Sequence, residues 1–190
     1  MGLRCTASMA SASSRKVLAS RRTSPTRWWK WPSAGGRDVI RPRHPSSDAL
    51  RGYERTPTCP PDPRLRVTGS FIPFDSPGNV TVDASVDGLH HEYEAPGQVE
   101  FEYQDVTHRL TVFAVHGGFE ILFRDSTSGV TTYGASREML VDTPNGHGHV
   151  TLDFNRATNP FCAYTDFATC PLPPPENRLS VAIEAGEKIP

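Results

Sequence analysis

Two cysteines near the C-terminus are the residues whose type and spacing first suggest chemistry. Cys162 and Cys170 have seven residues between them. A zinc site needs four ligands, usually in close pairs, and no second pair or nearby histidine completes one, so no metal site is expected. Cys162 could act as a nucleophile if a cation such as Arg124 or Arg156 lowered its pKa. The alternative is that both cysteines are small buried residues.

A set of polar residues lies outside the apolar alternation, on predicted strand ends and loops. Two or three arginine forks that converge on one pocket would bind a carboxylate or phosphate in bidentate fashion. Alternatively, these side chains form ion pairs and satisfy the backbone of loops. The candidate ligand-binding residues are Arg124, Asp125, Tyr133, Arg137, Asn155, Arg156, Asn159, Glu176 and Asn177.

Three classes of function follow from these residues. The first is a polar pocket that binds a small anionic molecule, with residues 118–125 and 150–156 bringing Arg124 and Arg156 to one rim. The second is an uncharacterised enzyme that uses Cys162 or Tyr133 together with these arginines. The third is a structural or interaction domain. The residues specify no particular cofactor and no oligomeric state.

The elements that must position these residues read as strands. Apolar residues alternate with polar ones, which is typical of half-buried antiparallel strands, and Gly- and Pro-rich segments between them indicate turns. We therefore predict an all-β fold, a single antiparallel sandwich or partly open barrel with an irregular N-terminal arm. The predicted strands are 64–71, 79–84, 98–103, 106–115, 119–125, 149–154 and 179–185, and the predicted turns are 76–79, 94–97, 103–106, 116–119, 126–129 and 144–148.

Charge divides the chain into two parts. Residues 1–60 carry 12 Lys and Arg against 3 Asp and Glu, whereas residues 61–190 carry 8 against 18. We interpret residues 1–27 as a disordered basic tail, or as spacer before a downstream start, because they have too little apolar surface to order. Residues 28–60 are predicted to be an arm that packs on the domain, and residues 61–190 to be the β domain.

The basic first part raises the question of nucleic acid, because arginines bind phosphate and Trp28, Trp29 and Trp31 could stack on bases. No recognised binding motif accompanies the charge, so nucleic acid is not the expected partner. The chain has neither a signal-peptide pattern nor an apolar run long enough to span a bilayer. We therefore expect no membrane association and a cytoplasmic location.

Several runs resemble a known family. They are "FRDSTSGVTTYGASREML" at 123–140, "LDFNRATNPFCAYTDFATCPLPPPENRLSVAIEAGEK" at 152–188, "PPDPRLRV" at 60–67 and "HPSSDAL" at 44–50. Together they are similar to the prokaryotic domain of unknown function family 1684, over about residues 31–188 and most closely from 119 onward. The resemblance implies a shared pattern and no settled activity. Within it, Pro173–Pro175 would form a stiff extended strap beside the candidate site.

Overall fold

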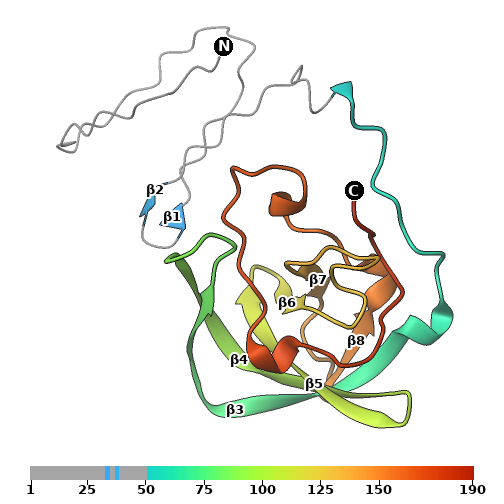
Figure 1. The fold of residues 1–190 in the computed structure, drawn as a ribbon. Coiled ribbons are helices and arrows are strands. Elements are labelled where there is room, and N and C mark those ends of the chain that lie inside the picture. Colours follow the sequence, from blue (N-terminus) through green and yellow to red (C-terminus); the bar gives the residue numbers. More distant parts are fainter. Residues whose placement is uncertain (1–32, 35–36, 39–50) are drawn as a thin grey trace, which may run out of the picture.

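The computed structural model describes residues 33–34, 37–38 and 51–190, and its main feature is one antiparallel sheet of six strands (Figure 1). The strand order is β7-β6-β5-β4-β3-β8. A separate pair joins β1 (Ser33–Ala34) to β2 (Arg37–Asp38). The sheet strands are β3 (Arg66–Asp83), β4 (His90–Tyr103), β5 (Val106–Val115), β6 (Gly118–Phe123), β7 (Arg137–Val141) and β8 (His149–Asp153).

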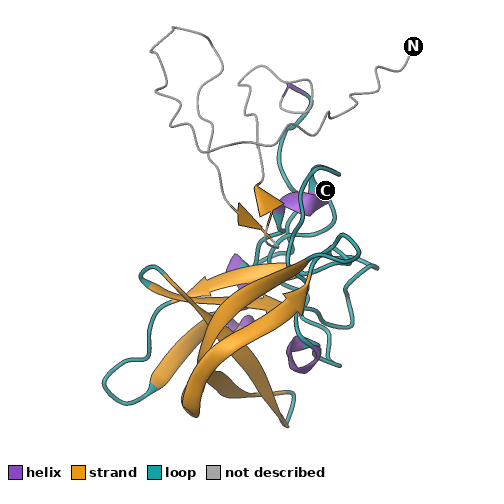
Figure 2. Cartoon of the chain, turned by 90° about the vertical axis from the view of Figure 1, so that its left-hand side faces the viewer, coloured by secondary structure: helices purple, strands orange, loops and turns teal. Residues whose placement is uncertain are grey.

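The sheet curls into a half-barrel, with the irregular segments gathered on one side (Figure 2). Alternate residues of β4 face the interior, and its Ala95, Val99 and Phe101 are buried. Leu110 and Val112 of β5 continue the same core. Side chains of a strand alternate between two faces, so alternate residues of each strand build this core, whereas β5 and β6 are buried on both faces in part of their length. The all-β prediction is confirmed, and of the two predicted architectures the partly open barrel is observed.

A smaller apolar cluster lies apart from the main core. It contains Val82, Ala95, Phe113 and Leu122, and Tyr93 packs against it. The ring centroids of Tyr93 and Phe113 are 4.8 Å apart. This cluster connects the end of β3 to β5 and β6, which makes that corner of the sheet a rigid base for the segments above it.

Two of the predicted turns lie inside long strands. Residues 76–79 belong to β3 and residues 94–97 to β4, and the register between these strands shifts between Pro73 and Gly78. Gly97 is opposite Pro73, and a Cβ atom on Gly97 would lie 2.3 Å from the carbonyl oxygen of Ile72. The Pro and Gly residues therefore mark an irregular pairing and a close backbone approach rather than chain reversals.

Other turns are where the sequence predicts them. Gln104 and Asp105 connect β4 to β5 with φ angles of 53° and 60°, the left-handed conformation that two-residue hairpin turns require. Gly117 has a φ of 86° between β5 and β6. These two short turns place β4, β5 and β6 side by side, as the alternating pattern indicates.

The prediction of a strand at 179–185 is wrong, and β7 is an additional strand. Leu179, Ile183 and Ala185 are buried, which explains the alternating pattern of this segment. Its backbone is held by scattered bonds, such as the 2.8 Å bond from Leu179 N to Arg124 O, and not by a ladder. The sequence pattern does not predict β7, because Arg137 is a charged residue at a fully buried position of this strand.

Residues just before the sheet contact the C-terminal segment. The N–H of Cys59 donates to Gly186 O at 2.8 Å, and the N–H of Lys188 donates to Pro57 O at 2.8 Å. The predicted tail, 1–27, and most of the predicted arm lie outside the described residues. Within the part of the chain that the structure describes, no helix has the length and apolarity that crossing a bilayer requires.

Four 3-10 turns complete the described structure: η1 (Pro63–Leu65), η2 (Phe154–Arg156), η3 (Phe161–Ala163) and η4 (Pro175–Asn177). Three of them fall in the irregular part after β8, where the chain crosses back to the ends of β3, β5 and β6. This crossing brings the polar candidate residues onto the sheet.

Candidate functional site

Arg137 and Asp125 form a buried ion pair. Neither side chain is exposed to solvent, and Arg137 Nη2 lies 3.3 Å from Asp125 Oδ1. The guanidinium also donates to the carbonyl oxygens of Ile183, at 3.0 Å, and Ala185, and it lies over the ring of Phe123 with its Cζ 4.9 Å from the ring centroid. The N–H of Ile183 donates to Asp125 Oδ2 at 2.6 Å. The pair therefore fastens the C-terminal segment to β6 and β7, and it faces no pocket.

Asn177 is also a structural residue. Its side chain is fully buried between β5 and β6, where Oδ1 accepts the N–H of Thr111 at 2.7 Å. Its Nδ2 donates to the carbonyl oxygens of Thr111, at 2.9 Å, and Leu122, at 2.8 Å. The neighbouring Glu176 accepts the hydroxyl of Thr111 at 3.1 Å. Asn177 thus takes the place of a strand partner where β5 and β6 separate.

Asn155 and Asn159 satisfy backbone groups in the same way. Asn155 exchanges two hydrogen bonds with the backbone of Asp62, at 2.8 and 2.9 Å. Asn159 Nδ2 donates to Lys188 O at 2.7 Å, and its own N–H donates to Glu187 Oε2 at 2.6 Å. These contacts agree with the alternative hypothesis, in which the polar side chains satisfy backbone groups of the loops.

Arg124 and Arg156 lie at opposite ends of β6. Arg124 directly follows the last residue of the strand, and its N–H donates to Asn177 O at 3.0 Å. Arg156 lines a cavity together with Gly117 and Gly118, at the start of the strand. A strand of six residues is about 20 Å long. The expectation that the two arginines share one rim is therefore not met.

The cavity beside Arg156 has a volume of about 300 Å³ and opens between β7, β8 and the turn before β6. Arg66 and His116 also line it. Arg66 Nε lies 3.9 Å from Asp153 Oδ2, and Asp153 is a further lining residue. Two guanidinium groups and an imidazole thus meet in a cavity that contains acidic groups as well.

The family-like segments 123–140 and 152–188 meet where Tyr133 of the first contacts Cys162 of the second, beside Cys170. The N–H of Cys162 donates to Cys170 Sγ at 3.1 Å, and the Tyr133 hydroxyl donates to Cys162 O at 2.9 Å. Ser85, just after β3, receives the N–H of Cys170 on its Oγ at 3.1 Å and donates its own N–H to Cys170 O at 2.8 Å. Cys162 is partly exposed, whereas Cys170 is buried. Both thiols are free.

These contacts give the two thiols different pKa values. Hydrogen bonding from Cys170, with smaller effects from Tyr133 and Ser85, lowers the pKa of Cys162 to about 6, although burial opposes this. The bond with Cys162 and burial raise the pKa of Cys170. The Cys162 N–H would also favour charge on Cys170, so the pair titrates jointly. We assign the first negative charge to Cys162 because it is partly exposed to water, whereas Cys170 is buried.

Acidic residues rather than arginines surround this thiol pair. Burial raises the pKa of Glu138 to about 7, and the charges of Glu120 and Cys162 act in the same direction. Burial also raises the pKa of Glu120. Neither Arg124 nor Arg156 is among the groups that lower the pKa of Cys162, which are Cys170, Tyr133 and Ser85.

Sequence reasoning missed Ser85, Glu120 and Glu138. Ser85 carries no motif, and it reaches Cys170 across 85 residues of sequence. One feature of the sequence marks the two glutamates. Each lies within a strand, β6 or β7, next to apolar residues. The spacing of Cys162 and Cys170 was visible, but spacing alone does not separate a packed pair from a reactive one.

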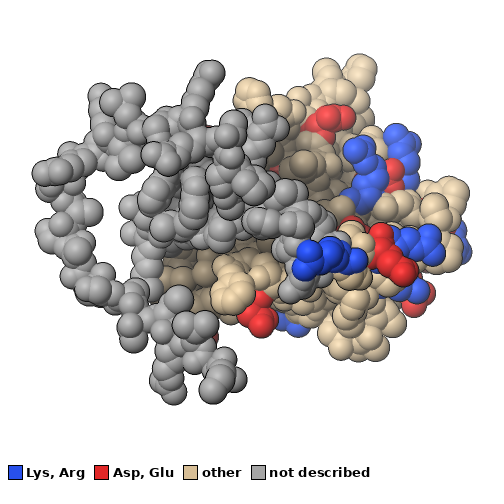
Figure 3. All heavy atoms as spheres, turned by 90° about the horizontal axis from the view of Figure 1, so that it is seen from above, with Lys and Arg blue, Asp and Glu red and all other residues tan. Residues whose placement is uncertain are grey.

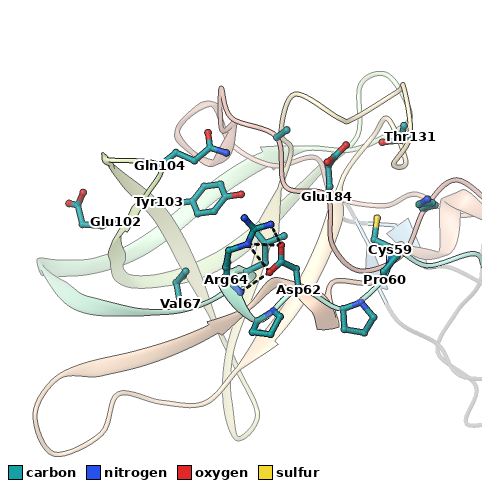
Figure 4. A pocket seen from close by; sticks show the side chains of 15 residues that line it. Cys59, Pro60, Asp62, Arg64, Val67, Glu102, Tyr103, Gln104, Thr131 and Glu184 are labelled. Atoms are coloured by element: carbon teal, nitrogen blue, oxygen red, sulfur yellow. Dashed lines mark hydrogen bonds and ion pairs between the residues drawn. The ribbon is translucent and has the colours of Figure 1, made fainter.

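A wider groove lies elsewhere, at the mouth of the half-barrel (Figure 4). It has a volume of about 930 Å³ and is lined by residues of both charges, among them Arg64, Glu102, Glu184 and Lys188. Arg64 is already paired with Asp62 at 2.7 Å, as the dashed lines in the figure mark. None of the predicted ligand-binding residues lines this groove.

Charge on the described surface is mixed. In Figure 3, basic and acidic side chains alternate over the coloured part of that face. Among the described residues, no group of three or more His, Cys, Asp or Glu side chains could hold a metal ion. A further cavity of about 600 Å³ is lined by Arg109, Arg178 and the predicted residue Glu176.

Fold and site together define an all-β half-barrel whose irregular C-terminal half carries a free thiol pair. The chain belongs to the family described as "Protein of unknown function (DUF1684)", which matches residues 51–188. It is similar to an uncharacterised protein of Haloarcula marismortui with a solution NMR structure, at 29% identity and a TM-score of 0.62. That alignment covers 76% of this chain and 82% of the other. No curated protein matches the chain.

Proposed function

We propose that this protein acts through a reactive thiol, Cys162, as an enzyme or exchange protein whose nucleophile is the Cys162 thiolate. One observation carries the proposal, which is the position of Cys162 beside a second free thiol: its backbone N–H donates to Cys170 Sγ at 3.1 Å, and its carbonyl oxygen accepts the Tyr133 hydroxyl at 2.9 Å. A thiolate is the nucleophilic form of cysteine, and Cys170, with smaller effects from Tyr133 and Ser85, lowers the pKa of the Cys162 thiol. With a pKa of about 6, Cys162 is mostly ionised at pH 7.

The surroundings of Cys162 support this role in two ways. The residue is partly exposed, so a reagent can approach its sulfur. Tyr133 acts as a positioning residue, because its hydroxyl holds the carbonyl of Cys162 and so fixes the η3 turn. A reactive thiol of this kind would persist in a reducing compartment, which supports our proposal of a location in the prokaryotic cytoplasm.

The rate of alkylation tests the proposal. Iodoacetamide should modify Cys162 faster than free cysteine at neutral pH, with a rate that reaches half its maximum near pH 6. Peptide mapping assigns the modified residue, and the buried Cys59 of the same chain is the internal control. Cys170→Ala and Tyr133→Phe should each move the midpoint up toward the ordinary value of about 8.5. A Cys162 rate no faster than that of free cysteine at neutral pH would refute the proposal.

A second candidate function is the binding of a small anionic molecule beside Arg156. The observation that favours it is the presence of Arg66, Arg156 and His116 in one cavity. Two guanidinium groups suit a carboxylate or phosphate, but the ligand must compete with Asp153, which lies 3.9 Å from Arg66.

Calorimetric titration with inorganic phosphate tests the second candidate. Arg66→Ala and Arg156→Ala should each weaken binding, and the double variant should lose less than the sum because both groups serve one ligand. Arg124→Ala is the matched control, since Arg124 lies at the other end of β6, and it should leave binding unchanged. Equal phosphate affinity in all four proteins would exclude this cavity as the site.

A further inference from the structure

Cys170 is fixed to the sheet. Beyond its two bonds with Ser85, the chain continues into Pro171, which forms a bridge with Ala84. The next N–H, that of Leu172, donates to Asp83 O at 2.7 Å. The sulfur of Cys170 is thus held at the end of β3, above the small apolar cluster.

Cys162 is held more loosely. It lies in the η3 turn, whose backbone bonds are local: Ala163 N donates to Pro160 O and Tyr164 N donates to Phe161 O, both at 3.0 Å. Cys162 itself meets the Tyr133 hydroxyl and the Cys170 sulfur, and Tyr164, which follows the turn, is held through its hydroxyl by Thr56 and Glu187 at 2.7 and 3.1 Å. A short turn of this kind can adjust its position while the sheet stays in place.

The two sulfurs are within reach of each other. The nitrogen of Cys162 is 3.1 Å from Cys170 Sγ, and an N–Cα bond is about 1.46 Å, so the Cα atom of Cys162 lies within about 4.6 Å of that sulfur. A disulfide requires close Cα atoms and suitable side-chain directions. Rotation of the Cys162 side chain, helped by small shifts of η3, meets these requirements without a rearrangement of the sheet.

We propose that Cys162 and Cys170 form a reversible intramolecular disulfide, in which Cys162 attacks a hydroperoxide and Cys170 resolves the product. The inference rests on the proposed reactivity of Cys162 and adds a partner thiol and an oxidant. The unequal anchoring assigns the roles: the partly exposed thiol meets the oxidant, and the buried, fixed thiol meets only Cys162.

The reaction balances in two steps. The Cys162 thiolate attacks the outer oxygen of the hydroperoxide, the O–O bond breaks, and the alkoxide or hydroxide that leaves takes a proton from water. Cys162 is then a sulfenic acid, oxidised by two electrons. The Cys170 sulfur attacks the Cys162 sulfur, its proton leaves with the sulfenic hydroxyl as water, and the S–S bond forms. An external dithiol restores both thiols by exchange.

The charges near the pair favour a neutral oxidant. The charge of Glu138, on β7, acts together with those of the two thiols, and the charge of Asp166 acts on Tyr133. These carboxylates repel anionic disulfides such as oxidised glutathione, whereas a hydroperoxide is uncharged at neutral pH. The negative charge near the thiols therefore favours a hydroperoxide as the oxidant.

Stoichiometric hydrogen peroxide on the full, reduced chain tests the inference. Intact mass should fall by two hydrogen atoms, peptide mapping should find Cys162 joined to Cys170, and dithiothreitol should reverse the change. Cys162→Ser should abolish the disulfide. Cys170→Ser should instead accumulate a sulfenic acid on Cys162 that dimedone traps. The Cys59→Ala variant is the matched control, and it should behave as the wild type.

Two results distinguish this inference from the proposed function. If Cys162 alkylates rapidly but peroxide leaves the wild type without a Cys162–Cys170 disulfide, the resolving role of Cys170 is wrong while the reactive thiol stands. If Cys162 alkylates no faster than free cysteine and no sulfenic acid is trapped in Cys170→Ser, both are wrong. Faster oxidation by oxidised glutathione than by peroxide would overturn the oxidant class.

Discussion

Removal of Arg137 should destabilise the domain more than removal of any exposed arginine. Arg137→Met keeps much of the aliphatic volume and deletes the guanidinium. It leaves Asp125 buried without a cation and leaves the carbonyl oxygens of Ile183 and Ala185 without this donor. Breaking a buried ion pair by removing one partner costs about 3–5 kcal/mol. Because whole domains are stable by about 5–15 kcal/mol, the variant should lose a large fraction of its stability.

Urea unfolding at neutral pH, followed by circular dichroism, measures this loss. Arg109→Met is the matched control: Arg109 pairs with Glu100 at 2.7 Å, but its side chain is 60% exposed, so its removal should cost less than about 1 kcal/mol. Asp125→Asn and the double variant complete a cycle, and the double variant should lose less than the sum of the two single ones. Equal losses for the Arg137 and Arg109 variants would refute the structural role assigned to the buried pair.

Two further predictions concern the strand interior and pH. Gly97→Ala should lower the free energy of unfolding in urea by about 1–3 kcal/mol, because its Cβ would lie 2.3 Å from Ile72 O. The control Gly78→Ala should be close to neutral, because the nearest atom to its Cβ is 3.9 Å away. Similar losses in the two variants would contradict the close approach of β3 and β4. Glu138 has a folded-state pKa raised to about 7, so its contribution to stability falls as pH rises from about 4.5 to 7. Glu138→Gln should therefore raise Tm relative to wild type at pH 8 and much less at pH 5, and an equal change at both pH values would contradict the raised pKa.

The strands that sequence predicts best are those whose neighbours in the sheet are also neighbours in the chain. β4, β5 and β6 follow one another through two short turns, so alternation and turn chemistry together determine their pairing. Residues 179–185 show the limit of alternation, because Ile183 and Ala185 are buried without joining a ladder. Alternation of apolar and polar residues indicates which side chains are buried, whereas a strand also requires an unpaired sheet edge with which its backbone can form hydrogen bonds.

The candidate site was harder to predict because polar side chains in this domain often replace backbone partners. Asn177 bonds to Thr111, which is 66 residues away, and Asn155 bonds to Asp62, which is 93 residues away. A sequence shows that such residues are polar and outside the apolar pattern. It does not show whether they meet an unpaired strand edge or a ligand, since both depend on contacts between distant segments.

The two signature segments do meet, but at a different point from the one that the arginines suggested. Tyr133 contacts Cys162 at 2.9 Å, and the backbones of Glu138 and Thr158 exchange two hydrogen bonds of 2.9 Å. The junction holds thiols, a phenol and half-buried carboxylates. A small anion would be repelled there by Glu138, whereas the pKa of the Cys162 thiol is lowered by Cys170, Tyr133 and Ser85. The meeting of the segments therefore favours thiol chemistry over anion binding at this position, and it leaves the cavity beside Arg156 as a separate place for an anion.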